Sequence, residues 1–193
     1  MSDSEIASLC QQIYRQHRQA LDLIYEHRPD LQTEIFDYLT KLISSREQEF
    51  GLQEDGSRKQ FIRFAPLELD SLAFQSTCEY WTTSKRLLLC EFVNESTYLG
   101  LHIVLGPGDK VYKQRISKAL RDGNIAGFRN RCQLKESGWS RVCKRRILGA
   151  SDYVDEDWDS LREKITDFFD LYLRHDLKKI CDAILSEFRP NHA

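Results

Sequence analysis

Apolar side chains recur at helical spacing through the first fifty residues of the chain. The first stripe comprises Ile6, Leu9, Cys10, Ile13, His17, Leu21 and Ile24. A second stripe follows Arg28-Pro29-Asp30 and comprises Leu31, Ile35, Leu39, Leu42 and Ile43. Because proline disfavours helical conformation in the residue before it, we expect two helices that are separated here. Asp30 is expected to cap the second helix, and Ser2 and Glu5 to form a capping box at the start of the first.

The middle of the chain changes to shorter apolar runs, which are typical of strands. After a polar loop predicted over residues 44–59, the segment FIRFAP at 61–66 is the first strand candidate. Residues 87–93 are almost continuously apolar, as in a strand that is covered on both faces. Residues 99–105 alternate, so their leucine and isoleucine side chains share one face. The segment WSRVCKRRIL at 139–148 also alternates and predicts another strand.

The order of these elements predicts the fold class. A third helix is expected after Asp109, and a long amphipathic helix over residues 155–188, with a kink near Arg174–Asp176. Strands joined by a short link pair antiparallel. We therefore predict one α+β domain over residues 1–193: a helical pair over 1–50, and over 58–193 an antiparallel sheet of about four strands, with the long C-terminal helix packed on it.

Composition and the cysteines narrow the class of protein. The formal net charge is −2, so the chain is not a globally basic nucleic-acid binder, although local basic patches are not excluded. The six cysteines form no CxxC pair, and the acidic start MSDSEIASLC is unlike a signal peptide. We expect reduced thiols and a cytoplasmic protein. No apolar run approaches the length of a membrane span, so no membrane partner is expected.

The Gly106-Pro107-Gly108 corner before the third helix has two interpretations. Glycines at a helix N-terminus can bind phosphate through backbone N–H groups. However, Pro107 removes one such donor, and Asp109 places negative charge where a phosphate would lie. Neither GxxxxGK[ST] nor GxGxxG occurs in the chain. We therefore predict a strand-to-helix corner in which Asp109 caps the helix.

Glu91 and His102 are the candidate catalytic residues. Glu91 interrupts the apolar run LLLCEFV, where a buried carboxylate would be unusual. His102 lies on the neighbouring strand and could pair with Glu91 across the strands. If Glu91 has only a structural role, it faces a solvent edge or pairs with an arginine on a strand. One carboxylate is not a metal site, and neither HExxH nor GxSxG occurs, so no metal or cofactor is expected.

Charge is distributed unevenly along the chain. Between residues 110 and 146 only Asp122 and Glu136 oppose a run of basic residues, whereas acidic residues dominate from 151 onward. The basic run comprises Lys110, Lys113, Arg115, Lys118, Arg121, Arg129, Arg131, Lys135, Arg141, Lys144, Arg145 and Arg146. These residues could form a surface that binds the phosphate backbone, with Trp139 available to stack on bases. Alternatively, the acidic last helix could pack beside them and neutralise their charge. They could also form a charged contact surface for a protein partner. The sequence does not rank these three interpretations.

Four stretches, spread from Ala20 to Ile184, carry a family resemblance. They are ALDLIYEHRPDLQTEI, WTTSKRLLLCEFVN, LHIVLGPGD, and GWSRVCKRRIL followed by the acidic helix. They resemble a region of bacterial and phage PD-(D/E)XK nuclease superfamily proteins that lies downstream of the nuclease core. The superfamily's catalytic signature, an acidic residue followed by a strand bearing Glu-x-Lys, does not occur here. The resemblance therefore implies an accessory region with a regulatory, targeting or nucleic-acid-contacting role.

These observations favour a non-catalytic binding or regulatory module that contacts the backbone of DNA or RNA. The expected phosphate contacts are Arg129, Arg131, Arg141, Lys144, Arg145 and Arg146. One alternative is a protein-interaction, sensor or oligomerisation domain of a defence-type or phage system, which binds a protein partner or a second copy through the first helical pair. The other is a metal-dependent hydrolase centred on Glu91 and His102.

Overall fold

The computed structural model describes residues 2–26, 30–78, 80–155 and 157–188. Its contacts divide the chain into two compact units, residues 1–31 and residues 32–193, and each is described by itself. The prediction that residues 1–193 form one domain stays a prediction. Among the described residues, no helix is both long and apolar enough to cross a membrane.

The larger unit is built on a five-stranded antiparallel sheet with strand order β1-β2-β3-β4-β5. The strands are β1 (Leu52–Glu54), β2 (Phe61–Pro66), β3 (Leu88–Glu95), β4 (Tyr98–Leu105) and β5 (Ser140–Leu148). The helices are α2 (Leu31–Phe50), α3 (Lys110–Asp122), α4 (Asp152–Asp155), α5 (Trp158–Leu171) and α6 (Lys178–Phe188). Two short 3-10 turns, η1 (Leu67–Leu69) and η2 (Ala73–Ser76), precede β3, and the π-helical segment η3 (Tyr172–Leu177) joins α5 to α6. The predicted α+β class is confirmed.

The sheet has five strands where about four were predicted, because β1 lies in the segment predicted as a loop. α2 continues to Phe50, and Gly51, with a φ of 60°, turns the chain into β1. β1 then pairs antiparallel with the end of β2, from Leu52 opposite Pro66 to Glu54 opposite Phe64. Of its three side chains only that of Leu52 is buried, so the strand leaves almost no hydrophobic pattern.

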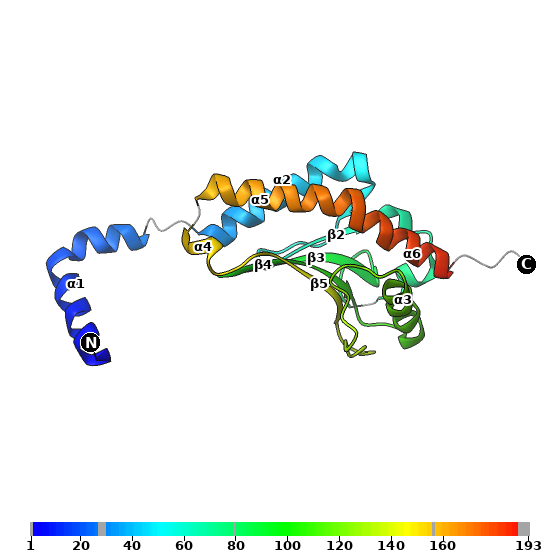
Figure 1. Cartoon of the computed structure of the whole chain (residues 1–193), viewed down its shortest axis with the longest axis horizontal. Helices are drawn as coiled ribbons and strands as arrows, with labels where there is room; N and C mark the ends of the chain where they lie inside the picture. Colours follow the sequence, from blue (N-terminus) through cyan, green and yellow to red (C-terminus); the bar gives the residue numbers. More distant parts are fainter. Residues whose placement is uncertain (1, 27–29, 79, 156, 189–193) are drawn as a thin grey trace, which may run out of the picture. The chain divides into compact units, whose positions relative to one another are not determined.

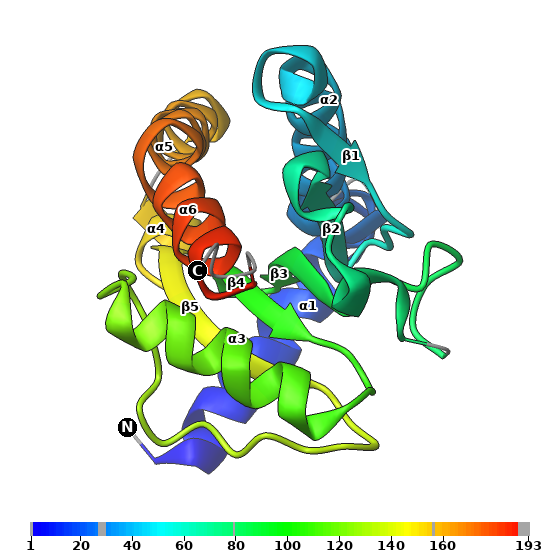
Figure 2. The ribbon, with the colours of Figure 1, turned by 90° about the vertical axis from the view of Figure 1, so that its right-hand side faces the viewer.

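One side of the sheet is covered by α2, α5 and α6 (Figure 1). The ring of Phe169 on α5 makes edge contacts with Phe64 and Phe92, at centroid distances of 5.5 and 5.3 Å. α2 contributes fully buried isoleucine and leucine side chains, and Arg46 on α2 donates two hydrogen bonds to Asp170 on α5. α3 and residues 123–139 lie on the other side of the sheet (Figures 1 and 2).

The acidic C-terminal helix changes from α-helical to π-helical winding where the sequence predicted a kink. Residues 172–177, which contain Arg174–Asp176, are π-helical. Here the buried Tyr172 hydroxyl lies 3.5 Å from the sulfur of Cys90, and burial raises the pKa of that thiol to about 12. The six cysteines are free, as expected.

The smaller unit holds α1 (Asp3–Glu26). The backbone N–H of Ser2 donates to Glu5 Oε2 at 2.7 Å, which is one half of the predicted capping box. Its apolar stripe is exposed: Ile6, Leu9 and Ile13 are each more than 40% accessible. Arg28 and Pro29, the predicted break, lie outside the described residues.

Candidate nucleic-acid interface

A row of ionisable side chains crosses the sheet on the face opposite the helices. In the strand registers Arg63 is opposite Glu91, Glu91 is opposite His102, and His102 is opposite Lys144. Side chains of directly paired residues lie on the same face of a sheet. Neighbouring residues of β3 point to the helical side, where Cys90 meets Tyr172 and Phe92 meets Phe169. The row therefore belongs to the face without the helical layer.

Glu91 is paired with two arginines. It is 3% exposed, and Arg63 Nε donates to its Oε2 at 2.8 Å. Arg141 Nη2 lies 3.9 Å from the other carboxylate oxygen. This is the arginine pairing that was expected if Glu91 has only a structural role. Glu91 therefore belongs to an ion-pair network with Arg63 and Arg141 on this face of the sheet.

His102 is buried among cations. It is 4% exposed, its Nε2 lies 3.1 Å from the Tyr98 hydroxyl, and its Nδ1 has no partner among the described residues. The pair expected with Glu91 exists as a strand register, but no hydrogen bond joins the two side chains where the structure describes them. Burial, with the charges of Arg141, Lys144 and Arg129, lowers the pKa of His102 from 6.5 to about 4. The imidazole is therefore neutral at pH 7.

This depressed pKa makes the folded state sensitive to mild acid. Below pH 6.5 the unfolded chain binds a proton at His102 that the folded chain does not bind until about pH 4, so stability is lost as the pH falls. Between pH 7 and pH 5 we expect a loss on the order of 2 kcal/mol in the free energy of unfolding. The His102→Gln variant should lack this loss, and the exposed His175→Gln should retain it, in urea unfolding at the two pH values. Equal pH dependence in wild type and His102→Gln would contradict the assignment.

The predicted phosphate contacts divide between the two sides of β5. Arg141 is paired with Val104, Lys144 with His102 and Arg146 with Gly100, so these three side chains share the face opposite the helices. We call these three residues the basic face; each is exposed. Arg129 and Arg131, in the segment before β5, are also exposed.

Arg145 is not brought together with the basic face. Its guanidinium donates to Asp176 at 2.6 Å and lies 5.3 Å from the centroid of the Phe168 ring, on the helical side. Its partner in β4 is Leu101, whose side chain points toward the helices. Arg145 therefore ties β5 to the C-terminal helix and is left out of the proposed contact set.

Part of the basic run is neutralised by the acidic helix. Arg115 and Lys118 on α3 both pair with Glu187, at 3.2 and 3.0 Å. Lys113 was counted with the surface charges, but it is fully buried. Its ammonium donates to the backbone carbonyls of residues 135, 136 and 138, and burial lowers its pKa.

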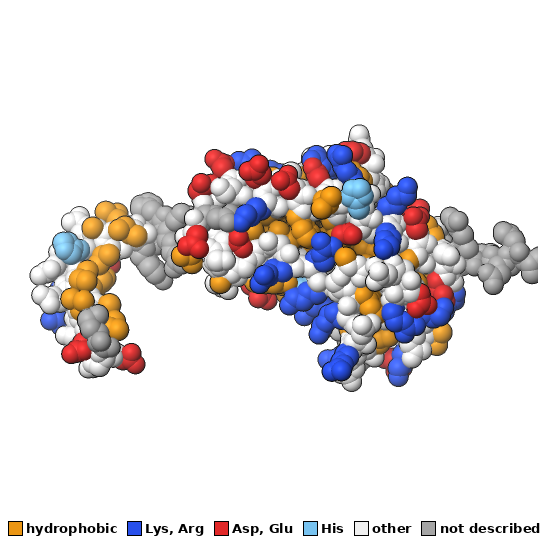
Figure 3. All heavy atoms as spheres, in the orientation of Figure 1, with side chains coloured by type: hydrophobic (Ala, Val, Ile, Leu, Met, Phe, Trp, Pro, Cys, Tyr) orange, Lys and Arg blue, Asp and Glu red, His pale blue; other side chains and the backbone are white. Residues whose placement is uncertain are grey.

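Other residues of the basic run lie away from the acidic helix. Figure 3 shows acidic side chains gathered over α5, and basic ones on the opposite side of the body, around β5 and the segment before it. In the described parts of the chain, Arg129, Arg131, Lys144 and Arg146 form no ion pair. Intramolecular cancellation by the acidic helix therefore holds for Arg115, Lys118 and Arg145, and Lys144 and Arg146 of the basic face lie outside it.

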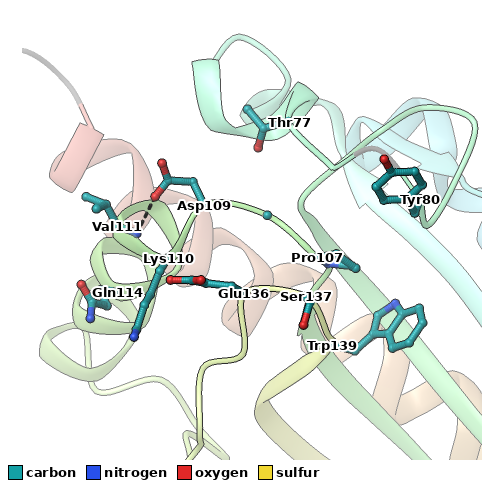
Figure 4. A pocket seen from close by; sticks show the side chains of 11 residues that line it. Thr77, Tyr80, Pro107, Asp109, Lys110, Val111, Gln114, Glu136, Ser137 and Trp139 are labelled. Carbon is teal, nitrogen blue, oxygen red and sulfur yellow. Dashed lines mark hydrogen bonds between the residues drawn. The ribbon is translucent and has the colours of Figure 1, made fainter.

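Two adjoining pockets of about 790 Å³ each lie beside the basic face, and sequence reasoning missed both. They share Tyr80, Ser137 and Trp139. Figure 4 shows the first pocket, in which Asp109 accepts a hydrogen bond from the N–H of Val111 at 2.6 Å. This bond confirms that Asp109 caps α3 at the predicted strand-to-helix corner, because the carboxylate satisfies one of the N–H donors that a phosphate would need. Trp139, proposed for stacking, is 55% exposed at the wall of both pockets.

Comparison with protein-family models, curated proteins and solved structures finds no match for this chain. Within the described residues, no three His, Cys, Asp or Glu side chains are grouped so that they could hold a metal ion. The site is therefore interpreted from its own geometry.

Proposed function

We propose that this chain is a non-catalytic module that binds the phosphate backbone of nucleic acid through the uncovered side of its sheet. The observation that carries the proposal is the basic face, with three exposed cations on one strand and the acidic helix on the opposite side. Lys144 and Arg146, which form no ion pair among the described residues, can release the counterions of a polynucleotide on binding. Arg129 and Arg131 extend the same surface from the preceding segment. The resemblance to PD-(D/E)XK accessory regions supports this role.

The test is binding of labelled DNA and RNA, single-stranded and duplex, at several salt concentrations. The logarithm of the association constant should fall linearly with the logarithm of the salt concentration, with a slope of about −0.7 for each single-strand phosphate neutralised. Absence of binding at low salt, or an affinity that does not respond to salt, would remove the proposal.

A second candidate function is self-association through α1. Ile6, Leu9 and Ile13 follow the three-four spacing of a helix–helix seam, and all three are exposed. The helix carries charges of both signs, so two copies of it can lie side by side without strong repulsion. Leu9→Glu should shift a dimer toward monomer in light scattering, whereas Gln12→Glu, also on α1 but outside this spacing, should not. A wild-type chain that is monomeric at high concentration would exclude this function.

A further inference from the structure

The two pockets beside the basic face differ in chemistry although they share one wall. The first lies between the Gly106–Gly108 corner, the start of α3 and the segment before β5. In Figure 4, Tyr80 and Trp139 lie along one side of this pocket, and Val111 and Gln114 of α3 lie along the other. The second pocket lies on the uncovered face of the sheet and reaches Glu91 and Arg141.

Charge separates the two pockets. The first contains Asp109 and Glu136 against Lys110, with Pro107, Val111 and Trp139 as apolar wall, so it disfavours an anion. The second is lined by cationic side chains, namely Arg58, Arg63, Lys135 and Arg141, against a single carboxylate. That carboxylate, Glu91, already accepts a hydrogen bond from Arg63. An anionic group is therefore favoured in the second pocket, and an uncharged ring in the first.

Exposed aromatic side chains stand where the two pockets meet. Tyr80 is 83% and Trp139 is 55% exposed, and both line both pockets. Proteins that bind single strands stack unpaired bases on exposed aromatic rings beside a cationic groove, because every base has a face that can stack. A base within a duplex is stacked on both faces and does not offer that surface.

The wall that carries Trp139 is fixed in place by Lys113. This buried ammonium donates to the carbonyls of Lys135, Glu136 and Gly138, directly before Trp139. The N–H of Gly108 donates to the Glu136 carbonyl at 2.9 Å and joins the same segment to the corner. The three donors of one lysine thus hold three carbonyl groups within four residues of the wall. An aromatic ring positioned in this way loses little conformational entropy when a base stacks on it.

We propose that the paired pockets hold one unpaired nucleotide of a single-stranded polynucleotide. The base stacks on Trp139 in the first pocket, with Tyr80 as a second aromatic wall. The adjoining phosphate lies in the second pocket against Arg58 and Arg141. This inference rests on the proposed backbone binding and adds to it a preference for single strands.

The test compares single-stranded DNA and RNA, the matching duplexes and an abasic strand, with the whole wild-type chain and its variants at several salt concentrations. Wild type should bind single strands more tightly than duplex or abasic strand, and Trp139 fluorescence should be quenched. Trp139→Leu should bind single strands about tenfold more weakly with an unchanged salt slope, because stacking is lost and no charge is removed. Tyr80→Leu should weaken binding in the same direction. Leu171→Ala, which removes exposed apolar surface on α5, is the matched control and should bind as wild type.

The outcomes separate this inference from the proposed function. Salt-dependent binding with equal affinity for single strand, duplex and abasic strand, unchanged in both aromatic variants, would overturn the nucleotide pocket and leave backbone binding intact. No binding of any polynucleotide at low salt would overturn both. Preference for DNA or for RNA among single strands supports the pocket in either case and identifies the sugar that it accepts.

Discussion

Reversing the charge of Arg129, Lys144 and Arg146 to glutamate is expected to weaken polynucleotide binding by at least about 100-fold at low salt. These three side chains are exposed and form no ion pair within the described chain, so the change removes attraction to phosphate without breaking an ion pair. The slope of log affinity against log salt should become shallower by about 2, because three single-strand phosphate contacts contribute about 0.7 each.

A matched triple variant provides the control for this result. Lys41, Arg174 and Lys178 are exposed on α2, η3 and α6, on the helical side of the sheet. Their replacement with glutamate changes the net charge by the same amount. If both triple variants lose affinity equally, binding follows total charge, and the basic face has no special role.

Replacing Arg86 with alanine is expected to destabilise the fold by about 3 to 5 kcal/mol. Arg86 is 8% exposed, donates to Asp55 at 2.9 Å, and makes two hydrogen bonds with Asp70, at 2.6 and 2.8 Å. Without its guanidinium, the Asp55 carboxylate stays buried, at 6% exposure, with its cationic partner gone. The loss of stability follows from that uncompensated charge more than from the bonds themselves.

Urea unfolding at pH 7 measures this effect, and Arg46→Ala is the control. Arg46 also makes two hydrogen bonds with one aspartate, but both side chains of that pair are about a quarter exposed. Water therefore takes the place of the lost partner, and we expect a cost of about 1 kcal/mol or less. If the Arg86→Ala and Arg46→Ala variants lose similar amounts of stability, burial of the Arg86–Asp55 pair contributes less than expected.

The fold followed from hydrophobic periodicity wherever an element buries a regular face. α2, β4 and the long C-terminal helix are examples of such elements, and β3 was recognised by a continuous apolar run instead. β1 was missed because a strand of three residues with one buried side chain has no period to detect. The prediction also failed for Lys113, although its spacing from Ile116 and Leu120 placed it on the buried stripe of α3. A charged residue on such a stripe is a signal that its partners are backbone groups.

The candidate site was less accessible to sequence reasoning because it depends on irregular strand pairing. Strict alternation along β5 would place Arg141 and Arg145 on one face. Irregularities between Ile103 and Val104, and between Leu99 and Gly100, shift the register. They bring Arg141 onto the side of Lys144 and Arg146 and leave Arg145 with the helices. The aromatic wall depends on Tyr80, in a segment without periodicity, so no pattern predicted that it would meet Trp139.

β5 is the last strand of the sheet, and residues 127–129 run along its outer edge. The N–H of Arg129 donates to the Val142 carbonyl, and the N–H of Lys144 donates to the Gly127 carbonyl, each at 2.9 Å. Gly127 has a φ of 77°, and a Cβ there would lie 2.5 Å from the Lys144 carbonyl oxygen, so a larger residue would push this segment away. An unpaired strand edge is a template for aggregation. The same short segment that presents Arg129 thus also covers part of the β5 edge of the sheet against pairing with a neighbouring molecule.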